Sequence, residues 1–222
     1  IINGHYSKGL KILNRENTIS KVTEERIDKL LEGVQNVAVA RTRKYKFVNG
    51  EGSKIESDVD CAIYDMSQNI VLIMEAKWRD NHYFDEIDKA YGRIFKTLIK
   101  AYSDQISKHQ EFMSRPGSMD FIFKEDKRYV SPKETPTFCY IVVDKRNQMH
   151  IADKHMISEY MLVYYLRRYI NDGKLNLKRM WEEISQLRTE VKYISSSNEY
   201  KEFEIGEYKI LVENGELHLD YL

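Results

Sequence analysis

The chain has 222 residues, of which 42% are hydrophobic and 32% are charged, so it can bury a core and falls outside the disordered class. Lys plus Arg and Asp plus Glu both number 35, which excludes a global basic field that would draw the chain to nucleic acid. No apolar run reaches the length of a membrane span, and no signal peptide is visible. We therefore expect a folded protein with no membrane partner.

The pattern along the chain predicts three parts. Residues 1–19 are weakly patterned and form an N-terminal segment or a linker from a preceding domain. Residues 20–150 form the core, and residues 151–222 add a helical extension with a terminal β-hairpin in the same compact unit. The sequence begins at Ile1 rather than Met, so we expect a piece of a larger protein. Cys61 and Cys139 lie in predicted strands without paired spacing, which predicts reduced, buried thiols and a cytoplasmic location.

The first regular elements are a helix and a basic strand. Thr23 can cap a helix that carries Glu25 in its first turn, and apolar residues follow at helical spacing. A strand is predicted over Val37–Val48, ending at the turn signal Asn49-Gly50. Aromatic residues alternate in this strand with four basic ones, Arg41, Arg43, Lys44 and Lys46. Such a strand can follow a phosphate backbone, or it can be a solvated edge that charge protects from aggregation.

The stretch Asp58–Lys77 reads as a β-hairpin around which the rest of the chain is organised. Cys61–Tyr64 and Ile70–Met74 are short apolar runs rich in β-branched residues, with turn-forming residues between them. A loop of four residues, Met66–Asn69, would fix the register of the two strands.

That register places Asp60 opposite Glu75 and Asp58 opposite Lys77, with all four side chains on one face. Carboxylates a few ångströms apart repel one another unless a cation joins them. Their hard oxygen atoms suit Mg²⁺, which keeps most of its waters and takes one or two carboxylates. A lysine beside such a metal can orient a water or neutralise charge that develops on a phosphate. The alternative is a hairpin whose acids only pair with Lys77 on a solvated face.

Asp60, followed by an apolar strand, a turn, a second apolar strand and Glu75-Ala76-Lys77, resembles the PD-(D/E)XK nuclease superfamily. The proline of the family name is absent, since Val59 precedes Asp60. The resemblance covers about residues 20 to 145. It implies a restriction-endonuclease-like fold, an α/β class with a central mixed β-sheet flanked by helices.

The resemblance also implies roles for particular residues. Asp60, Glu75 and Lys77 would be catalytic, with Asp60 and Glu75 binding Mg²⁺, for which Mn²⁺ can substitute. Auxiliary candidates are Asp58, Glu25 on the preceding helix, and Gln105 on the helix that follows the lysine strand. Beyond this motif, Trp78 and Arg79 are next to the predicted metal site and are candidates for contact with nucleic acid, although Trp78 can equally pack in the core.

The remaining elements follow from periodicity and turn signals. The stretch from about Asp85 to Met113 is helical, as one helix or as two with a break near Gly92. The other predicted elements are strands at Met119–Phe123, Phe138–Val143 and Met149–Ile151, helices at Ile157–Ile170 and Leu177–Tyr193, and a hairpin over Tyr200–Leu222 that turns at Glu213-Asn214-Gly215.

The sequence thus predicts a Mg²⁺-dependent nuclease whose partner is nucleic acid, DNA in preference to RNA. Its superfamily suggests a role in restriction, defence against phage or repair. With zero net charge, we expect it to act as a homo-oligomer or beside further domains of a larger protein. Two alternatives are a restriction-like fold kept as a nucleic-acid or protein docking domain without catalysis, and a scaffold domain of a larger assembly.

Overall fold

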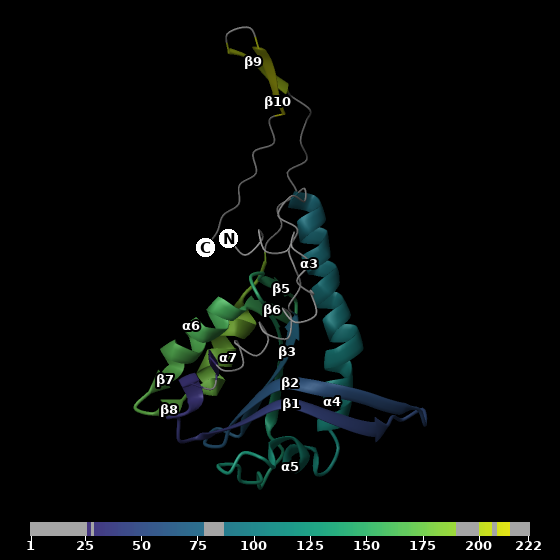
Figure 1. Cartoon of the computed structure of the whole chain (residues 1–222), viewed down its shortest axis with the longest axis vertical. Coiled ribbons are helices and arrows are strands. Elements are labelled where there is room, and N and C mark those ends of the chain that lie inside the picture. The colour runs from purple at the N-terminus through teal and green to yellow at the C-terminus, as the bar shows by residue number, and fades with distance from the viewer. Residues whose placement is uncertain (1–25, 28, 78–86, 190–199, 206–207, 214–222) are drawn as a thin grey trace, which may run out of the picture. The chain divides into compact units, whose positions relative to one another are not determined.

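The structure is a computed structural model, and it describes residues 26–27, 29–77, 87–189, 200–205 and 208–213 (Figure 1). The chain divides into two compact units, residues 1–188 and residues 189–222. The first unit has a six-stranded mixed sheet with helices packed on both faces, which confirms the predicted α/β class.

The sheet has the strand order β1-β2-β3-β4-β6-β5. Neighbours are antiparallel from β1 to β3, parallel from β3 through β4 to β6, and antiparallel between β6 and β5. The strand bounds are β1 (Val37–Val48), β2 (Lys54–Asp65), β3 (Ile70–Lys77), β4 (Thr137–Asp144), β5 (Met149–Ile151) and β6 (Lys154–Ser158). The predicted organising hairpin is therefore the pair β2–β3 near the centre of the sheet.

The loop Met66–Asn69 joins β2 to β3, and Asp65 is paired with Ile70 as a four-residue loop predicts. The Asp65 carboxylate accepts hydrogen bonds from the backbone N–H (3.0 Å) and the hydroxyl (2.6 Å) of Ser67. Asn69 adopts a positive φ of 52°, which asparagine tolerates better than most residues. Short polar side chains thus hold the turn that sets the register of the site.

Helices form the outer layers of this unit. Their bounds are α3 (Ile87–Ala101), η1 (Tyr102–Ile106), α4 (Ser107–Met113), α5 (Ser118–Phe123), α6 (Glu159–Tyr169) and α7 (Leu177–Gln186). Helices α3, η1, α4 and α5 pack on one face of the sheet. Leu98 of α3 and Ile106 of η1 are buried there, as are Phe112 of α4 and Phe123 of α5. Helices α6 and α7 and the helical residues near Leu31 cover the other face.

Helices α3 and α4 are joined through η1, a turn of π-helix, and Gly92 does not break the run. The backbone N–H of Ser107 donates to the carbonyl of Tyr102, five residues earlier. Such a wide turn changes the phase of the residues that follow it, and π-turns inside helices occur frequently at functional sites.

The strand predicted at Met119–Phe123 is wrong, because these residues belong to helix α5. Gly117 precedes the helix with a φ of 78°. Met119, Ile122 and Phe123 are buried at helical spacing in the core. A short apolar run fits a strand and a helix equally well by periodicity.

The last part of the first unit contains a small hairpin of β7 (Ile170–Asn171) and β8 (Lys174–Leu175), which ends α6 where the sequence predicts. Helix α7 ends at Gln186, before the predicted Tyr193, which lies outside the described residues. In the second unit, β9 (Tyr200–Ile205) and β10 (Tyr208–Glu213) pair antiparallel, with Ile205 opposite Tyr208. The turn predicted at Glu213-Asn214-Gly215 is therefore wrong, because the two strands are joined between Ile205 and Tyr208 and Glu213 is the last residue of β10, opposite Tyr200.

Cys61 and Cys139 are both buried and neither forms a disulfide, as their positions in strands predict. Burial raises the pKa of the Cys139 thiol to about 12, so it stays protonated. Among the helices that the structure describes, none has both the length and the apolar character needed to cross a membrane.

Candidate active site

Strands β2 and β3 separate where the predicted catalytic residues lie. Their last paired residues are Cys61 and Met74, although β2 stays paired with β1 and β3 with β4 beyond this point. At the fork a side chain replaces the missing backbone partner, because Oδ2 of Asp60 accepts a hydrogen bond of 2.7 Å from the N–H of Ala76. The Asp60 carboxylate is thereby fixed beside Glu75.

The carboxylates of Asp60 and Glu75 form an unfavourable pair in the absence of a cation. Glu75 is only 3% exposed, and Asp60 is partly buried. Burial, followed by the negative charges of Glu75 and Asp58, raises the pKa of Asp60 to about 7, against the opposing effects of the Ala76 N–H and Lys77. Raised pKa values of this kind, with specific charged neighbours, are typical of functional sites.

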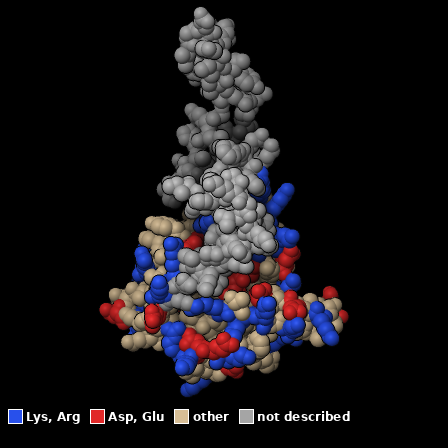
Figure 2. Space-filling model, viewed as in Figure 1, with Lys and Arg blue, Asp and Glu red and all other residues tan. Residues whose placement is uncertain are grey.

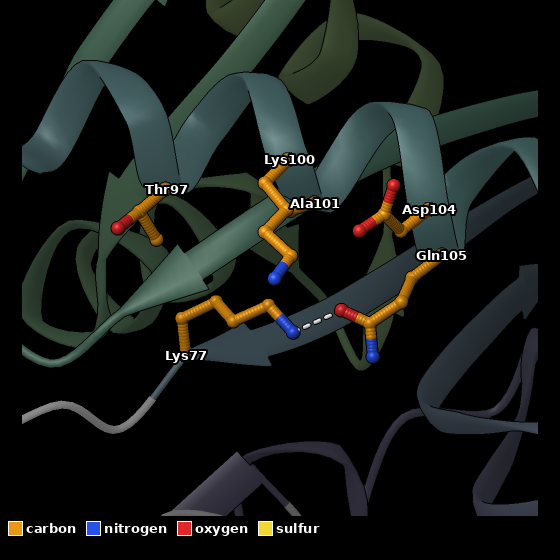
Figure 3. A pocket seen from close by; sticks show the side chains of 6 residues that line it. All are labelled: Lys77, Thr97, Lys100, Ala101, Asp104 and Gln105. Carbon is orange, nitrogen blue, oxygen red and sulfur yellow. Dashed lines mark hydrogen bonds between the residues drawn. The ribbon is translucent and has the colours of Figure 1, made fainter.

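Lys77 links this acid pair to the helical layer. Its ammonium group donates to Oε1 of Glu75 over 2.7 Å and also to Oε1 of Gln105, which lies on the π-turn η1 (Figure 3). The Lys77 side chain is 17% exposed, so its charge is partly shielded from water. Three residues that the sequence singles out, Glu75, Lys77 and Gln105, thus form one hydrogen-bonded group.

Two further residues extend this group, His109 by contact with Glu75 and Tyr45 by contact with His109, and sequence reasoning missed both. Nε2 of His109, on α4, lies 3.2 Å from Oε2 of Glu75, and its Nδ1 lies 2.6 Å from the hydroxyl of Tyr45 on β1. His109 lies four residues after Gln105, and that spacing places both on the same side of a helix. This spacing is the signal in the sequence from which His109 could have been found.

A pocket of about 310 Å³ opens beside the Lys77 ammonium group, between the end of β3 and the helix. It is lined by Lys77, Thr97, Lys100, Ala101, Asp104 and Gln105. Figure 3 shows the ammonium groups of Lys77 and Lys100 pointing into the same space, with the Asp104 carboxylate next to Gln105. The pocket therefore offers two cations and one acid to a bound group.

Asp58 lies near the site without the partner that the sequence predicts. The β2–β3 pairing ends at Cys61 and Met74, before both expected pairs, Asp60–Glu75 and Asp58–Lys77. Asp58 is instead opposite Lys44 of β1. Its charge still contributes to the raised pKa values of Asp60 and Tyr45. Asp58 is thus an electrostatic neighbour of the site.

The basic residues of β1 differ in their surroundings. The guanidinium of Arg43 donates to the carbonyl of Ile122 (3.2 Å) and to Glu125, so it holds α5 against the sheet. Lys46 forms an exposed ion pair of 3.0 Å with Glu56. Arg41 and Lys44 are exposed.

On the face shown in Figure 2, Lys and Arg are interspersed with Asp and Glu, so no region of one sign dominates it.

Three other predicted residues, Glu25, Trp78 and Arg79, lie outside the described residues. Within the described ranges, no group of three or more His, Cys, Asp or Glu side chains is arranged to hold a metal ion. The pair Asp60 and Glu75 still fits Mg²⁺, which is usually held by one or two carboxylates and several waters. Comparison of the chain with protein-family models, curated proteins and solved structures gives no match.

Proposed function

We propose that the protein is a metal-dependent nuclease of the PD-(D/E)XK type, with a restriction-endonuclease-like fold, that hydrolyses phosphodiester bonds of DNA. The observation that carries the proposal is the fork between β2 and β3, where Asp60 accepts from the backbone N–H next to Glu75, the charge of Glu75 raises the pKa of Asp60, and Lys77 donates to Glu75. The mixed sheet with helices on both faces is compatible with that fold.

In this proposal Asp60 and Glu75 hold Mg²⁺, or Mn²⁺ in its place. When bound, the ion polarises a phosphoryl oxygen and lowers the pKa of a bound water. Lys77 neutralises negative charge that develops on the phosphate and orients the attacking water. Gln105 restricts the Lys77 ammonium group to the rim of the pocket.

The pocket beside Lys77 is where a nucleic-acid phosphate would be held. Its two ammonium groups, from Lys77 and Lys100, suit an anion, and Asp104 adds an acid at the far side. Because Lys plus Arg equal Asp plus Glu in number, binding needs an oligomer or further domains to supply more contacts. A role in restriction, phage defence or repair in the cytoplasm is consistent with this chemistry.

Cleavage of supercoiled plasmid DNA, with single-stranded DNA and RNA in parallel, tests the proposal. We expect cutting with Mg²⁺ or Mn²⁺, none with EDTA, and loss of cutting in Asp60→Asn and Glu75→Gln. Glu182→Gln is the matched control, because Glu182 is an exposed carboxylate on α7. Undiminished cutting in EDTA, or equal activity in Glu75→Gln and Glu182→Gln, would contradict the proposal.

The second candidate is a docking domain with the same fold and no catalysis. It is favoured by one feature: both Glu75 oxygens already have partners, Lys77 and His109, so the hydrogen bonds of Glu75 are satisfied without a metal ion. Titration with Mn²⁺ separates the two candidates. A nuclease binds the ion and loses it in Glu75→Gln, whereas a docking domain of this kind binds no Mn²⁺ at the site.

A further inference from the structure

A chain of buried hydrogen bonds runs from β1 through α4 to the catalytic candidate on β3. It consists of Tyr45, His109 and Glu75, which are 1%, 0% and 3% exposed. The two distances are 2.6 Å from the Tyr45 hydroxyl to Nδ1 of His109 and 3.2 Å from Nε2 of His109 to Oε2 of Glu75. Strand β1 is not adjacent to β3 in the sheet, so the helix residue bridges over β2.

When His109 is neutral, the chemistry of the three groups assigns a direction to each hydrogen bond. An ionised carboxylate only accepts hydrogen bonds, so Nε2 of His109 carries the proton donated to Glu75. In neutral imidazole Nδ1 is then the acceptor, and the Tyr45 hydroxyl is the donor that satisfies it. Burial, with smaller contributions from nearby acids that include Glu75, raises the pKa of Tyr45 to about 12, so its proton remains available.

The Tyr45 ring is held in position by packing. It stacks on Phe112 with ring centroids 4.1 Å apart and an interplanar angle of 18°, and it also stacks on Phe47. The His109 ring meets it edge-on at 5.8 Å. A rigid tyrosine fixes where the histidine ring lies, and the histidine in turn fixes one oxygen of Glu75.

We propose that Tyr45 and His109 are positioning residues, which hold the Glu75 carboxylate oriented for the divalent cation by locking His109 as its Nε2–H tautomer. The inference rests on the proposed function for its cation. His109 holds Oε2, which fixes the orientation of the carboxylate and leaves its other lone pairs available to a cation. Partners of this kind typically contribute 10- to 100-fold to metal affinity.

The test is a double-mutant cycle read by Mn²⁺ affinity, measured by calorimetry on the full chain. The Nε2 atoms of Gln and His are reached through the same number of bonds, so His109→Gln can still donate to Glu75. His109→Leu keeps apolar volume and removes the donor. Tyr45→Phe keeps the stacked ring and removes the hydroxyl. Folding of each variant is checked by circular dichroism and melting.

We expect His109→Leu to weaken Mn²⁺ binding about 10- to 100-fold and His109→Gln to restore most of it. Tyr45→Phe should weaken binding severalfold with His109 present and should have no effect in the His109→Gln background, which has no tautomer to lock. Long-range proton–nitrogen NMR should show His109 as the Nε2–H tautomer in the wild type and a mixture in Tyr45→Phe.

The inference is overturned if Mn²⁺ binds without the help of Tyr45 and His109, or if Mn²⁺ does not bind at all, and the variants distinguish these two results. Mn²⁺ binding that is lost in Glu75→Gln but unchanged in His109→Leu and Tyr45→Phe shows that the site binds metal without this positioning. A purely structural role predicts lower melting temperatures with unchanged affinity and no rescue by Gln. Absence of Mn²⁺ binding in the folded wild type removes the proposed function, and the positioning role with it.

Discussion

The carboxylate of Asp60 accepts a 2.7 Å hydrogen bond from the backbone N–H of Ala76, so a side chain replaces a strand partner where β2 and β3 separate. A buried donor left without an acceptor costs free energy, and Asp60 removes that cost at the fork. Burial, followed by the negative charges of Glu75 and Asp58, raises the pKa of this acid to about 7, although the hydrogen bond from Ala76 lowers it. Asp60 therefore supplies a hydrogen bond that the sheet needs, and its negative charge is disfavoured at the same position.

The first prediction concerns the stability of the metal-free protein. Because the pKa of Asp60 is raised from its ordinary value near 4 to about 7 by folding, the native state binds its proton more tightly than the unfolded state does. That contribution to stability is complete below pH 4 and is lost as the pH rises through 7. We expect Asp60→Asn to be more stable than the wild type at pH 8 in EDTA, by at most a few kcal/mol.

The measurement is urea denaturation of wild type and Asp60→Asn in EDTA from pH 4 to pH 8. The stability difference between the two should grow as the pH rises and should shrink when Mg²⁺ is added, because only the wild type binds the ion well. Glu182→Gln serves as the control for removal of an exposed carboxylate. If the stability difference between wild type and Asp60→Asn does not change with pH, folding does not raise the pKa of Asp60.

The second prediction separates the two lysines of the pocket. Lys100 points into the pocket beside Lys77 (Figure 3). Among the described residues it forms no hydrogen bond with Asp60 or Glu75. A cation that holds the substrate equally in the ground state and the transition state affects KM and leaves kcat unchanged. We expect Lys100→Ala to raise KM severalfold with kcat nearly unchanged. Steady-state kinetics on a short DNA duplex checks this. A large fall in kcat in Lys100→Ala would show that Lys100 acts on the transition state.

The third prediction distinguishes structural from nucleic-acid contacts on β1. Arg43 bonds to Ile122 and Glu125, so Arg43→Ala should lower the melting temperature and leave the salt dependence of DNA binding unchanged. Arg41 and Lys44 are exposed, and Lys44→Ala should weaken DNA binding with a salt slope smaller by about 1 if it contacts a phosphate. Fluorescence anisotropy at several salt concentrations measures the slope. An unchanged slope in Lys44→Ala would favour the reading of β1 as a charge-protected edge.

Much of the fold could be predicted because the central strands are short apolar runs rich in β-branched residues and are bounded by turn-forming residues. Strand β1 and the β2–β3 loop lie where the sequence predicts. Helix α5 could not be distinguished from a strand, because six residues are too few for periodicity to decide.

Tertiary features explain what the sequence could not predict about the site. The motif predicts Asp60, Glu75 and Lys77 as one site, and the structure brings them together at the fork. The early end of the β2–β3 pairing, which separates Asp58 from Lys77, is a property of the whole sheet. The spacing of four residues from Gln105 places His109 on the same side of the helix, but its contact with Glu75 depends on the path of the helix after the π-turn, which no local pattern predicts.

The last prediction concerns Lys77, whose ammonium group lies between Glu75 and Gln105. A charge that acts mainly on the transition state is typically worth about two to three orders of magnitude in rate. We expect Lys77→Ala to cut plasmid DNA slower by that amount and to keep Mn²⁺ affinity within a few fold, since both carboxylates remain. Gln105→Leu should lose less activity, because it frees the ammonium group without removing it.

Plasmid cleavage with Mg²⁺, Mn²⁺ and Ca²⁺ completes this test. Ca²⁺ takes the same oxygen ligands with longer, looser bonds and positions water poorly, so we expect it to support DNA binding without cutting. Lys174→Ala is the matched control, since Lys174 is an exposed lysine on β8. Lys77→Ala should melt like this control, because the end of β3 keeps its backbone pairing with β4. Full activity in Lys77→Ala would mean that the lysine only balances the charge of Glu75, and the proposed mechanism would be wrong.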